Sequence, residues 1–199
     1  MKRAPVAFLV IAAIVVALGV LGISSYNGLV GANEKVNAAW GQVENVYQRR
    51  ADLIPNLVAT VKGAADFEKS TMIAVTEARA KVGSVQATAD VVNDPKAFER
   101  FQQAQDELSS ALSRLLVVSE NYPDLKATAA FRDLQSQLEG SENRITVERQ
   151  RFNEVAQEFN TRRNRFPTAL IAGFFGSKFA EKAYFHAAPG AATVPEVKF

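Results

Sequence analysis

The sequence of 199 residues contains no cysteine and only one histidine, His186. The absence of cysteine excludes disulfide bonds, thiolate nucleophiles, cysteine-ligated metal sites and the attachment of a lipid to a cysteine. A Ser-His-Asp triad would have to use His186, and a zinc site would lack the usual further histidine or cysteine ligands. No phosphate-binding loop and no pair of nucleophile and base stands out either, so we expect no cofactor, no metal site and no enzymatic activity.

Charged side chains are absent from residues 4–33, and residues 6–23 form an unbroken run of apolar residues and glycine. As a helix this run would measure about 27 Å, at roughly 1.5 Å per residue. That length nearly matches a hydrocarbon layer about 30 Å thick. We therefore predict an N-terminal membrane anchor over residues 1–25.

A cleaved signal peptide is the alternative to a retained anchor. Lys2 and Arg3 give a basic start, and Gly22-Ile23-Ser24 offers small residues for cleavage. The apolar run is longer than the roughly 7 to 15 residues of a signal-peptide core, which favours retention. Because Lys2 and Arg3 lie on the short side of the anchor, the positive-inside rule predicts a cytoplasmic N terminus and an extracytoplasmic bulk.

The chain beyond Asn33 carries balanced charge. Of the 23 lysine and arginine residues only Lys2 and Arg3 precede this point, whereas all 21 acidic residues follow it. A formally neutral domain lacks the basic surface of nucleic-acid-binding proteins, so no nucleic-acid partner is expected.

Apolar residues recur at intervals of three and four along three segments, which predicts an all-α fold. The first segment covers residues 26–84 and is expected to continue the anchor as one helix. Pro55 interrupts it, and should either kink this helix or lie in the first turn of a new helix capped by Asp52. The anchor followed by a long antiparallel bundle of three to four helices is the predicted architecture.

The other two segments are bounded by proline. Asp94 is expected to cap a helix that begins at Pro95 and stops before Pro123. The third helix should run over residues 124–166, with apolar spacing close to a coiled-coil heptad that includes Phe166. Polar residues 139–143 interrupt this seam. We interpret them as setting the register of packing, and the alternative is a carboxylate ligand site, although the Glu-x-x-His pairs of helical di-iron sites are absent.

The unequal helix lengths suggest assembly. A first helix that reached Ser84 would be far longer than the second, and its half nearest the membrane would lack a partner from its own chain. Exposed large apolar side chains cost about 1.5 to 3 kcal/mol each. We therefore expect a homo-oligomer that buries this stripe between copies, and the alternative is a hairpin at Pro55 that closes a four-helix bundle. The predicted self-association residues are Val36, Trp40, Val43 and Tyr47.

The C-terminal part, from Thr168 onward, is rich in aromatic residues. Its apolar run, residues 169–176, is too short to span a bilayer. It either caps the end of the bundle or contacts a partner or a membrane surface. His186 is interpreted as an edge residue, and residues 187–199 as a flexible tail. The residues predicted for this contact are Phe174, Phe175, Phe179, Tyr184 and Phe185.

Several blocks resemble the LemA family, and the similarity covers about residues 26–185. One departure is the presence of extra residues between Phe179 and the Tyr184-Phe185 pair. The matching blocks are Tyr26-Asn27-Gly28-Leu29-Val30, Ala39-Trp40, Val43-Glu44, Gln48-Arg49-Arg50-Ala51-Asp52-Leu53-Ile54-Pro55-Asn56-Leu57-Val58, Tyr122-Pro123-Asp124-Leu125-Lys126-Ala127, Leu138-Glu139-Gly140-Ser141-Glu142-Asn143-Arg144-Ile145 and Phe166-Pro167.

The resemblance implies a bacterial protein with one N-terminal membrane helix, a helical domain over residues 26–186 and no catalytic residues. It also implies kinship with a magnetosome-membrane protein and a link to membrane protein quality control. The expected location is the bacterial inner membrane. Arg49 and Arg50 either form a contact surface or pair with acids such as Asp52 or Glu142 near the kink.

The function expected from these observations is that of a non-enzymatic, membrane-anchored scaffold. It would associate with itself and organise the membrane or other envelope proteins. The alternative is a monomeric adaptor for an envelope protease or signalling system that acts through its aromatic C-terminal part.

Overall fold

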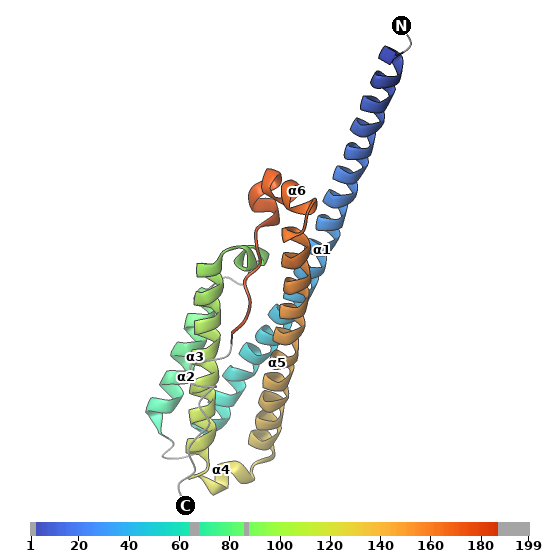
Figure 1. The fold of residues 1–199 in the computed structure, drawn as a ribbon. Coiled ribbons are helices and arrows are strands. Elements are labelled where there is room, and N and C mark those ends of the chain that lie inside the picture. The colour runs from blue at the N-terminus through green and yellow to red at the C-terminus, as the bar shows by residue number, and fades with distance from the viewer. Residues whose placement is uncertain (1–2, 64–67, 86–87, 187–199) are drawn as a thin grey trace, which may run out of the picture.

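The computed structural model describes residues 3–63, 68–85 and 88–186 (Figure 1). Within these ranges the chain is helical and contains no strand, which confirms the predicted all-α class. The predicted flexible tail, residues 187–199, lies outside them. The elements are α1 (Arg3–Lys62), α2 (Lys69–Ser84), η1 (Ala89–Asn93), α3 (Pro95–Ser119), α4 (Pro123–Ala127), α5 (Ala129–Asn164), α6 (Thr168–Phe175) and η2 (Gly176–Phe179).

The helices form an antiparallel bundle on one long helix (Figure 1). The C-terminal part of α1 packs along α5, and α2 packs along α3. Short α4 lies at the end of the bundle far from the N terminus, while α6 lies at the near end beside α1 (Figure 1). The N-terminal third of α1 extends beyond the bundle by itself.

This projecting part of α1 is the predicted membrane anchor. Its large apolar side chains between Phe8 and Ile23 are more than half exposed, since no other element covers them. Among the described residues, it is the one helix long and apolar enough to cross a membrane. From Leu29 onward the same helix buries a side chain every three or four residues, which marks the change from an exposed apolar helix to a helix of the bundle.

The prediction that the first helix continues to Ser84 is wrong. Helix α1 ends at Lys62, and the chain reverses direction before α2 begins at Lys69. Gly63 follows the last helical residue and has a weaker helix propensity than alanine, by about 1 kcal/mol. Pro55 lies inside α1, so the alternatives of a new helix at Asp52 and of a hairpin at Pro55 are also wrong. Asp94 does cap α3, since its carboxylate accepts hydrogen bonds from the amides of Lys96 and Ala97.

The earlier reversal explains how the chain covers its own apolar stripe. Helix α5 has 36 residues, so an antiparallel helix of this length, counted back from Lys62, reaches about Tyr26. Helix α3, with 25 residues, reaches about as far as the turn that holds Trp40. The prediction that the stripe lacks a partner within the chain is therefore wrong. Val36, Trp40, Val43 and Tyr47 are all buried in the core of the single chain.

Trp40 lies at the centre of an aromatic cluster. It is 1% exposed, and four phenylalanine rings surround it with centroids 5.2 to 6.1 Å away: Phe98, Phe101, Phe152 and Phe185. These rings come from α3, α5 and the segment after η2. A second cluster fills the far half of the bundle with Ile54, Leu57, Val61, Val75, Leu108, Leu112, Leu115, Leu125, Phe131, Leu134 and Leu138.

We predict that Trp40→Ala lowers the free energy of unfolding of the bundle by about 3–5 kcal/mol, because it leaves a cavity between three elements. Chemical denaturation in detergent, followed by circular dichroism, measures this loss. As a control, Val117→Ala removes a side chain that is 69% exposed and should change the stability by no more than about 0.5 kcal/mol. Equal, small effects of both substitutions would contradict the burial of Trp40.

Candidate membrane-proximal surface

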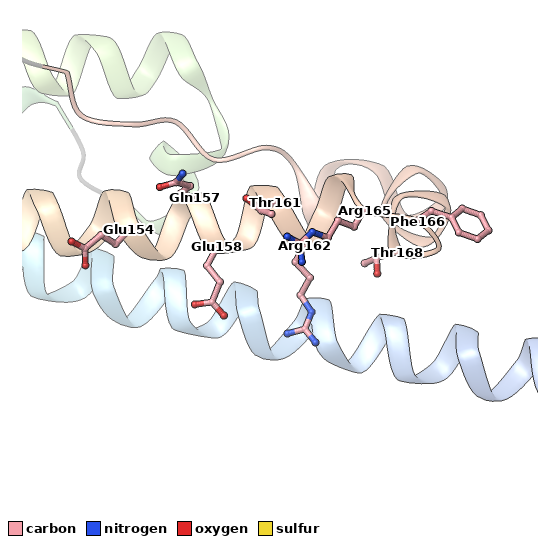
Figure 2. Close-up of a pocket in the computed structure, with 8 residues that line it drawn as sticks. All are labelled: Glu154, Gln157, Glu158, Thr161, Arg162, Arg165, Phe166 and Thr168. Carbon is pink, nitrogen blue, oxygen red and sulfur yellow. The ribbon is translucent and has the colours of Figure 1, made fainter.

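Helix α6 presents one packed side and one exposed apolar side. Ala172 is buried and Ile171 is partly buried in the core cluster that includes α1. On the other side, Leu170 is 66% exposed and Phe174 is 85% exposed. Their spacing of four residues places them on the same face of the helix. Phe166, just before α6, is 82% exposed, and its ring projects past the end of α5 toward the N-terminal part of α1 (Figure 2). We call Phe166, Leu170 and Phe174 the apolar foot.

Contacts to Tyr26 and Gly28 fix the position of this region along α1. The Tyr26 ring lies 4.9 Å from that of Phe175, between centroids, and its hydroxyl accepts a hydrogen bond of 2.6 Å from Lys178 Nζ. The Arg162 guanidinium lies against Gly28, where an added Cβ would come within 2.7 Å of Nη2. Glycine therefore gives the arginine room to approach α1. The contacts place α6 within about one helical turn of Ile23, the last residue of the apolar run.

The surface around the apolar foot is basic. No acidic residue occurs between Glu158 and Glu181, whereas four basic residues do: Arg162, Arg163, Arg165 and Lys178. Arg163 is held inward, since its Nε donates a hydrogen bond of 2.6 Å to the carbonyl oxygen of Phe179. A shallow groove beside α5 is lined by Glu154, Gln157, Glu158, Thr161, Arg162, Arg165, Phe166 and Thr168 (Figure 2).

The five residues predicted for a partner or membrane contact do not share one surface. Phe174 and Phe175 are exposed, Phe175 less so at 40%. Tyr184 is partly buried, and Phe179 and Phe185 are buried. Phe179 packs edge-on against Tyr26, and Phe185 joins the cluster around Trp40. Phe179 and Phe185 therefore do not belong to an exposed surface, because both rings are buried in the core of the bundle.

The segment after η2, residues 180–186, is held along the bundle by side-chain amides; we call it the C-terminal strap. The side chain of Asn160 donates a hydrogen bond of 2.9 Å to the carbonyl oxygen of Lys182 and accepts one of 2.8 Å from the Lys182 amide. Asn153 does the same for Phe185, at 2.9 Å each. Gln102 on α3 binds both groups of His186, at 2.9 and 3.3 Å. His186 is exposed, in agreement with its prediction as an edge residue.

Lys182 is the buried cation of the C-terminal strap. Its Nζ donates a hydrogen bond of 2.5 Å to Asn93 Oδ1 and lies 4.8 Å from the centroid of the Phe159 ring. Burial lowers the pKa of the Lys182 ammonium from 10.5 to about 8, and the negative charge of Asp90 opposes this shift.

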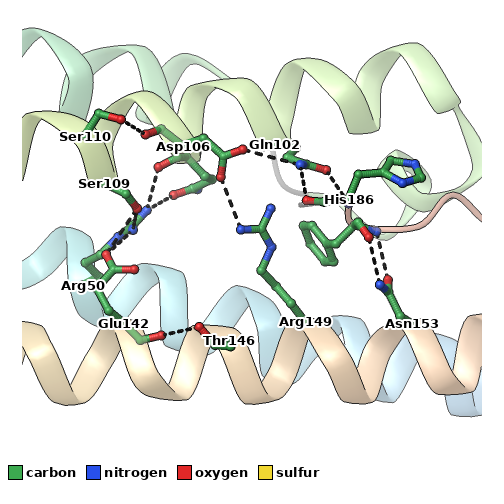
Figure 3. A network of polar contacts seen from close by, with 12 residues as sticks. Arg50, Gln102, Asp106, Ser109, Ser110, Glu142, Thr146, Arg149, Asn153 and His186 are labelled. Carbon is green, nitrogen blue, oxygen red and sulfur yellow. Dashed lines mark hydrogen bonds and ion pairs between the residues drawn. The ribbon is translucent and has the colours of Figure 1, made fainter. Parts of the chain in front are cut away.

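Arg50 anchors a polar network in the middle of the bundle (Figure 3). Its side chain is buried, and Nη1 donates to Glu142 Oε1 at 2.5 Å and to Ser109 Oγ at 2.6 Å. Nη2 donates to Gln105 Oε1 at 2.5 Å. The predicted pairing with Glu142 is confirmed, whereas Asp52 instead accepts a hydrogen bond from Gln48. The network links α1, α3 and α5.

The geometry of this network fits a structural role. Arg50 of α1 is bound by side chains of two other helices, α3 and α5, which is the arrangement expected of a polar contact that fixes packing register. The neighbouring phenol of Tyr47 is buried, which raises its pKa to about 12, so it is a poor proton donor near neutral pH. In the described part of the chain, no group of three or more histidine, cysteine or acidic residues is placed to hold a metal ion.

Phe166 and Leu170 were not predicted as exposed contact residues, although both side chains are exposed. Phe166 fits the heptad spacing of the third helix, but α5 ends at Asn164. Two signals were available in the sequence. Pro167 follows Phe166 immediately, and the region from Asn160 to Ala180 has no acidic side chain.

We predict that Lys182 makes the stability of the bundle rise with pH between about pH 8 and 10. In this range the unfolded chain binds the proton of Lys182 and the folded chain does not, so the free energy of unfolding increases, by roughly 1–2 kcal/mol. Urea denaturation at several pH values should show this rise in the unaltered chain and in a control, Lys96→Met, at an exposed lysine. The rise should be absent in Lys182→Met, and its persistence there would contradict the assignment.

Comparison with known proteins identifies two magnetosome proteins and a LemA protein as relatives. Magnetosome protein MamQ of Magnetospirillum gryphiswaldense is 26% identical over 84% of this chain and 67% of its own length. Magnetosome protein MamQ 2 of Paramagnetospirillum magneticum is 26% identical over 96% of this chain and 76% of its own length. Protein LemA of Metamycoplasma hominis is 23% identical over 73% of this chain and 63% of its own length.

The family comparison confirms the resemblance for the quoted sequence blocks from Ala39 onward. The LemA family model matches residues 39–199, from the turn of α1 that holds Trp40 to the last residue. This range includes the Arg50 network, the apolar foot and the C-terminal strap. The chain therefore belongs to the LemA family.

Proposed function

We propose that this protein is a non-enzymatic adaptor, anchored by α1 in the bacterial inner membrane, that presents its helical bundle to other envelope proteins. The observation that carries the proposal is the continuity of α1. Its exposed apolar third passes without a break into the helix that forms the core with α3 and α5. The bundle therefore stands at a fixed distance from the anchor, as a platform rather than a loosely tethered domain.

Its polar interior supports a non-enzymatic role. The conspicuous buried charge, Arg50, is bound by Glu142, Ser109 and Gln105 and is not directed into a cleft. The exposed features are instead spread over the outside of the bundle. They include single large apolar residues on three helices, Ile73, Val117 and Val147. The relatives named as magnetosome proteins further support a role at a membrane.

Burial of the Trp40 stripe favours a single-chain adaptor over the self-associating scaffold. The sequence-based reason for self-association was an uncovered stripe, and the chain covers that stripe itself. The charge bias of Lys2 and Arg3 supports an extracytoplasmic position of the bundle. An envelope protease or a signalling protein is the kind of partner that such a platform would serve.

We predict that photo-crosslinking in cells gives discrete adducts with another envelope protein. The photoreactive residue is placed singly at Ile73, Val117 or Val147, which are exposed on α2, α3 and α5. Light scattering of the purified chain in detergent should give the protein mass of one copy, 21.6 kDa. As a control, the same residue at Leu18, in the projecting part of α1, should give lipid adducts.

Two results would overturn this proposal. Adducts confined to a second copy of the chain, with an oligomeric mass in detergent, would restore the self-associating scaffold. An absence of protein adducts at all three positions, with lipid adducts retained at Leu18, would leave an anchored protein without an adaptor role.

A further inference from the structure

The apolar foot is an apolar face that the chain leaves uncovered although it packs the neighbouring residues. Ile171 and Ala172 of α6 are inserted against α1, whereas Phe166, Leu170 and Phe174 point away from the bundle and are 66 to 85% exposed. Helix α6 itself carries no charged side chain. Three large apolar side chains exposed within the short range of residues 166–174 favour an interaction surface over the singly scattered apolar residues that are normal on protein surfaces.

The height of the apolar foot above the anchor indicates what covers it. Tyr26, which contacts Phe175, follows Ile23 by three residues, a rise of about 5 Å along α1. Interfacial helices bury their apolar face about 5–10 Å into the boundary between headgroups and acyl chains. If residues 6–23 of α1 lie in the hydrocarbon layer, the apolar foot is at this boundary without any movement of the bundle.

The charges around the apolar foot match anionic headgroups. Arg162, Arg165 and Lys178 are exposed, and the region between Glu158 and Glu181 lacks acidic residues. Juxtamembrane basic residues are attracted to anionic lipid surfaces by about 1 kcal/mol each. The ammonium group of Lys178 donates a hydrogen bond to the hydroxyl of Tyr26. Tyr26 lies in the first turn of α1 after the apolar run, so Lys178 is held at the level expected for headgroups.

From these observations we propose that the apolar foot inserts into the lipid bilayer beside α1, with Arg165 and Lys178 on anionic headgroups. The bundle then contacts the membrane at two points, the span of α1 and the apolar foot, and cannot rotate freely about the anchor. The proposal rests on the membrane anchoring in the proposed function, but not on the adaptor role.

The absence of cysteine allows a direct test by single labels. Phe166, Leu170 or Phe174 is replaced by cysteine, labelled with a nitroxide, and the full chain is reconstituted into phosphatidylcholine vesicles with or without phosphatidylglycerol. Electron paramagnetic resonance then compares collisions of the label with oxygen, which concentrates in lipid, and with a water-soluble nickel complex. We predict greater accessibility to oxygen at all three positions. Leu18→Cys is the control in the span, and Val117→Cys is the control exposed to water.

With the label at position 174, two further substitutions test the hydrophobic and the electrostatic contributions to insertion separately. Leu170→Gln should shift the equilibrium of the label toward water by about tenfold or more, since a leucine is withdrawn from the lipid. Arg165→Gln should shift it about fivefold in vesicles with phosphatidylglycerol and leave it unchanged in phosphatidylcholine alone.

A water-exposed label at all three foot positions, with Leu18→Cys in lipid, would overturn the proposal and leave the adaptor intact. Shielding of the foot only in native membranes would overturn it too and assign the foot to a protein partner. A water-exposed label at Leu18→Cys would remove the anchor, and the proposed function would fail with it.

Discussion

The structure depends on one helix, α1, whose first part is suited to lipid and whose remaining part packs in the bundle. In its first third, α1 is apolar on every side, as a lipid-facing helix must be. From Leu29 it carries a single apolar stripe that the bundle buries. Because the helix is unbroken between these parts, the orientation of the stripe is fixed relative to the anchor. Every other element must then pack on the side of α1 that this stripe presents.

The reversal after Lys62 decides how much of the stripe the chain can cover. Helices α2 and α5 run back toward the anchor from this end, so their lengths determine how far toward the membrane the bundle reaches, while α3 starts near Trp40 and runs in the same direction as α1 (Figure 1). Helix α3 brings Phe98 and Phe101 to Trp40, while α5 continues as far as Gly28. The C-terminal strap then supplies Phe185, which closes the remaining side of the aromatic cluster. The result is a single chain that buries its own stripe and leaves the apolar foot uncovered near the anchor.

Features set by local periodicity and proline could be predicted from the sequence. They include the anchor and the cap of α3 at Asp94. The pairing of Arg50 with Glu142 was only one of several alternatives, because the two residues are far apart in the sequence. The reversal at residue 63 was missed because apolar residues continue on both sides of it, Val61 before and Val75 after, with helical spacing. A stripe alone does not show whether one helix continues or two helices face each other. That single error produced the expectation of an uncovered Trp40.

The candidate surface was predictable only in part for a related reason. Helical periodicity assigned Phe166 to the core, although α5 ends two residues before it. The C-terminal strap has no periodicity, and its position depends on side chains such as Asn153 and Asn160 that bind main-chain groups far away in the sequence. Such contacts leave no repeated pattern. Phe179 and Phe185 therefore could not be distinguished from Phe174 by composition.

Hydrogen–deuterium exchange of the full chain in lipid nanodiscs tests the continuity of α1 most directly. The decisive amides are those of residues 24–31, where the helix leaves the membrane and enters the bundle. A continuous helix predicts slow exchange there, comparable with residues 32–47 in the bundle. Exchange in this segment as fast as in an exposed loop, with both flanks protected, would show a flexible tether and contradict the account.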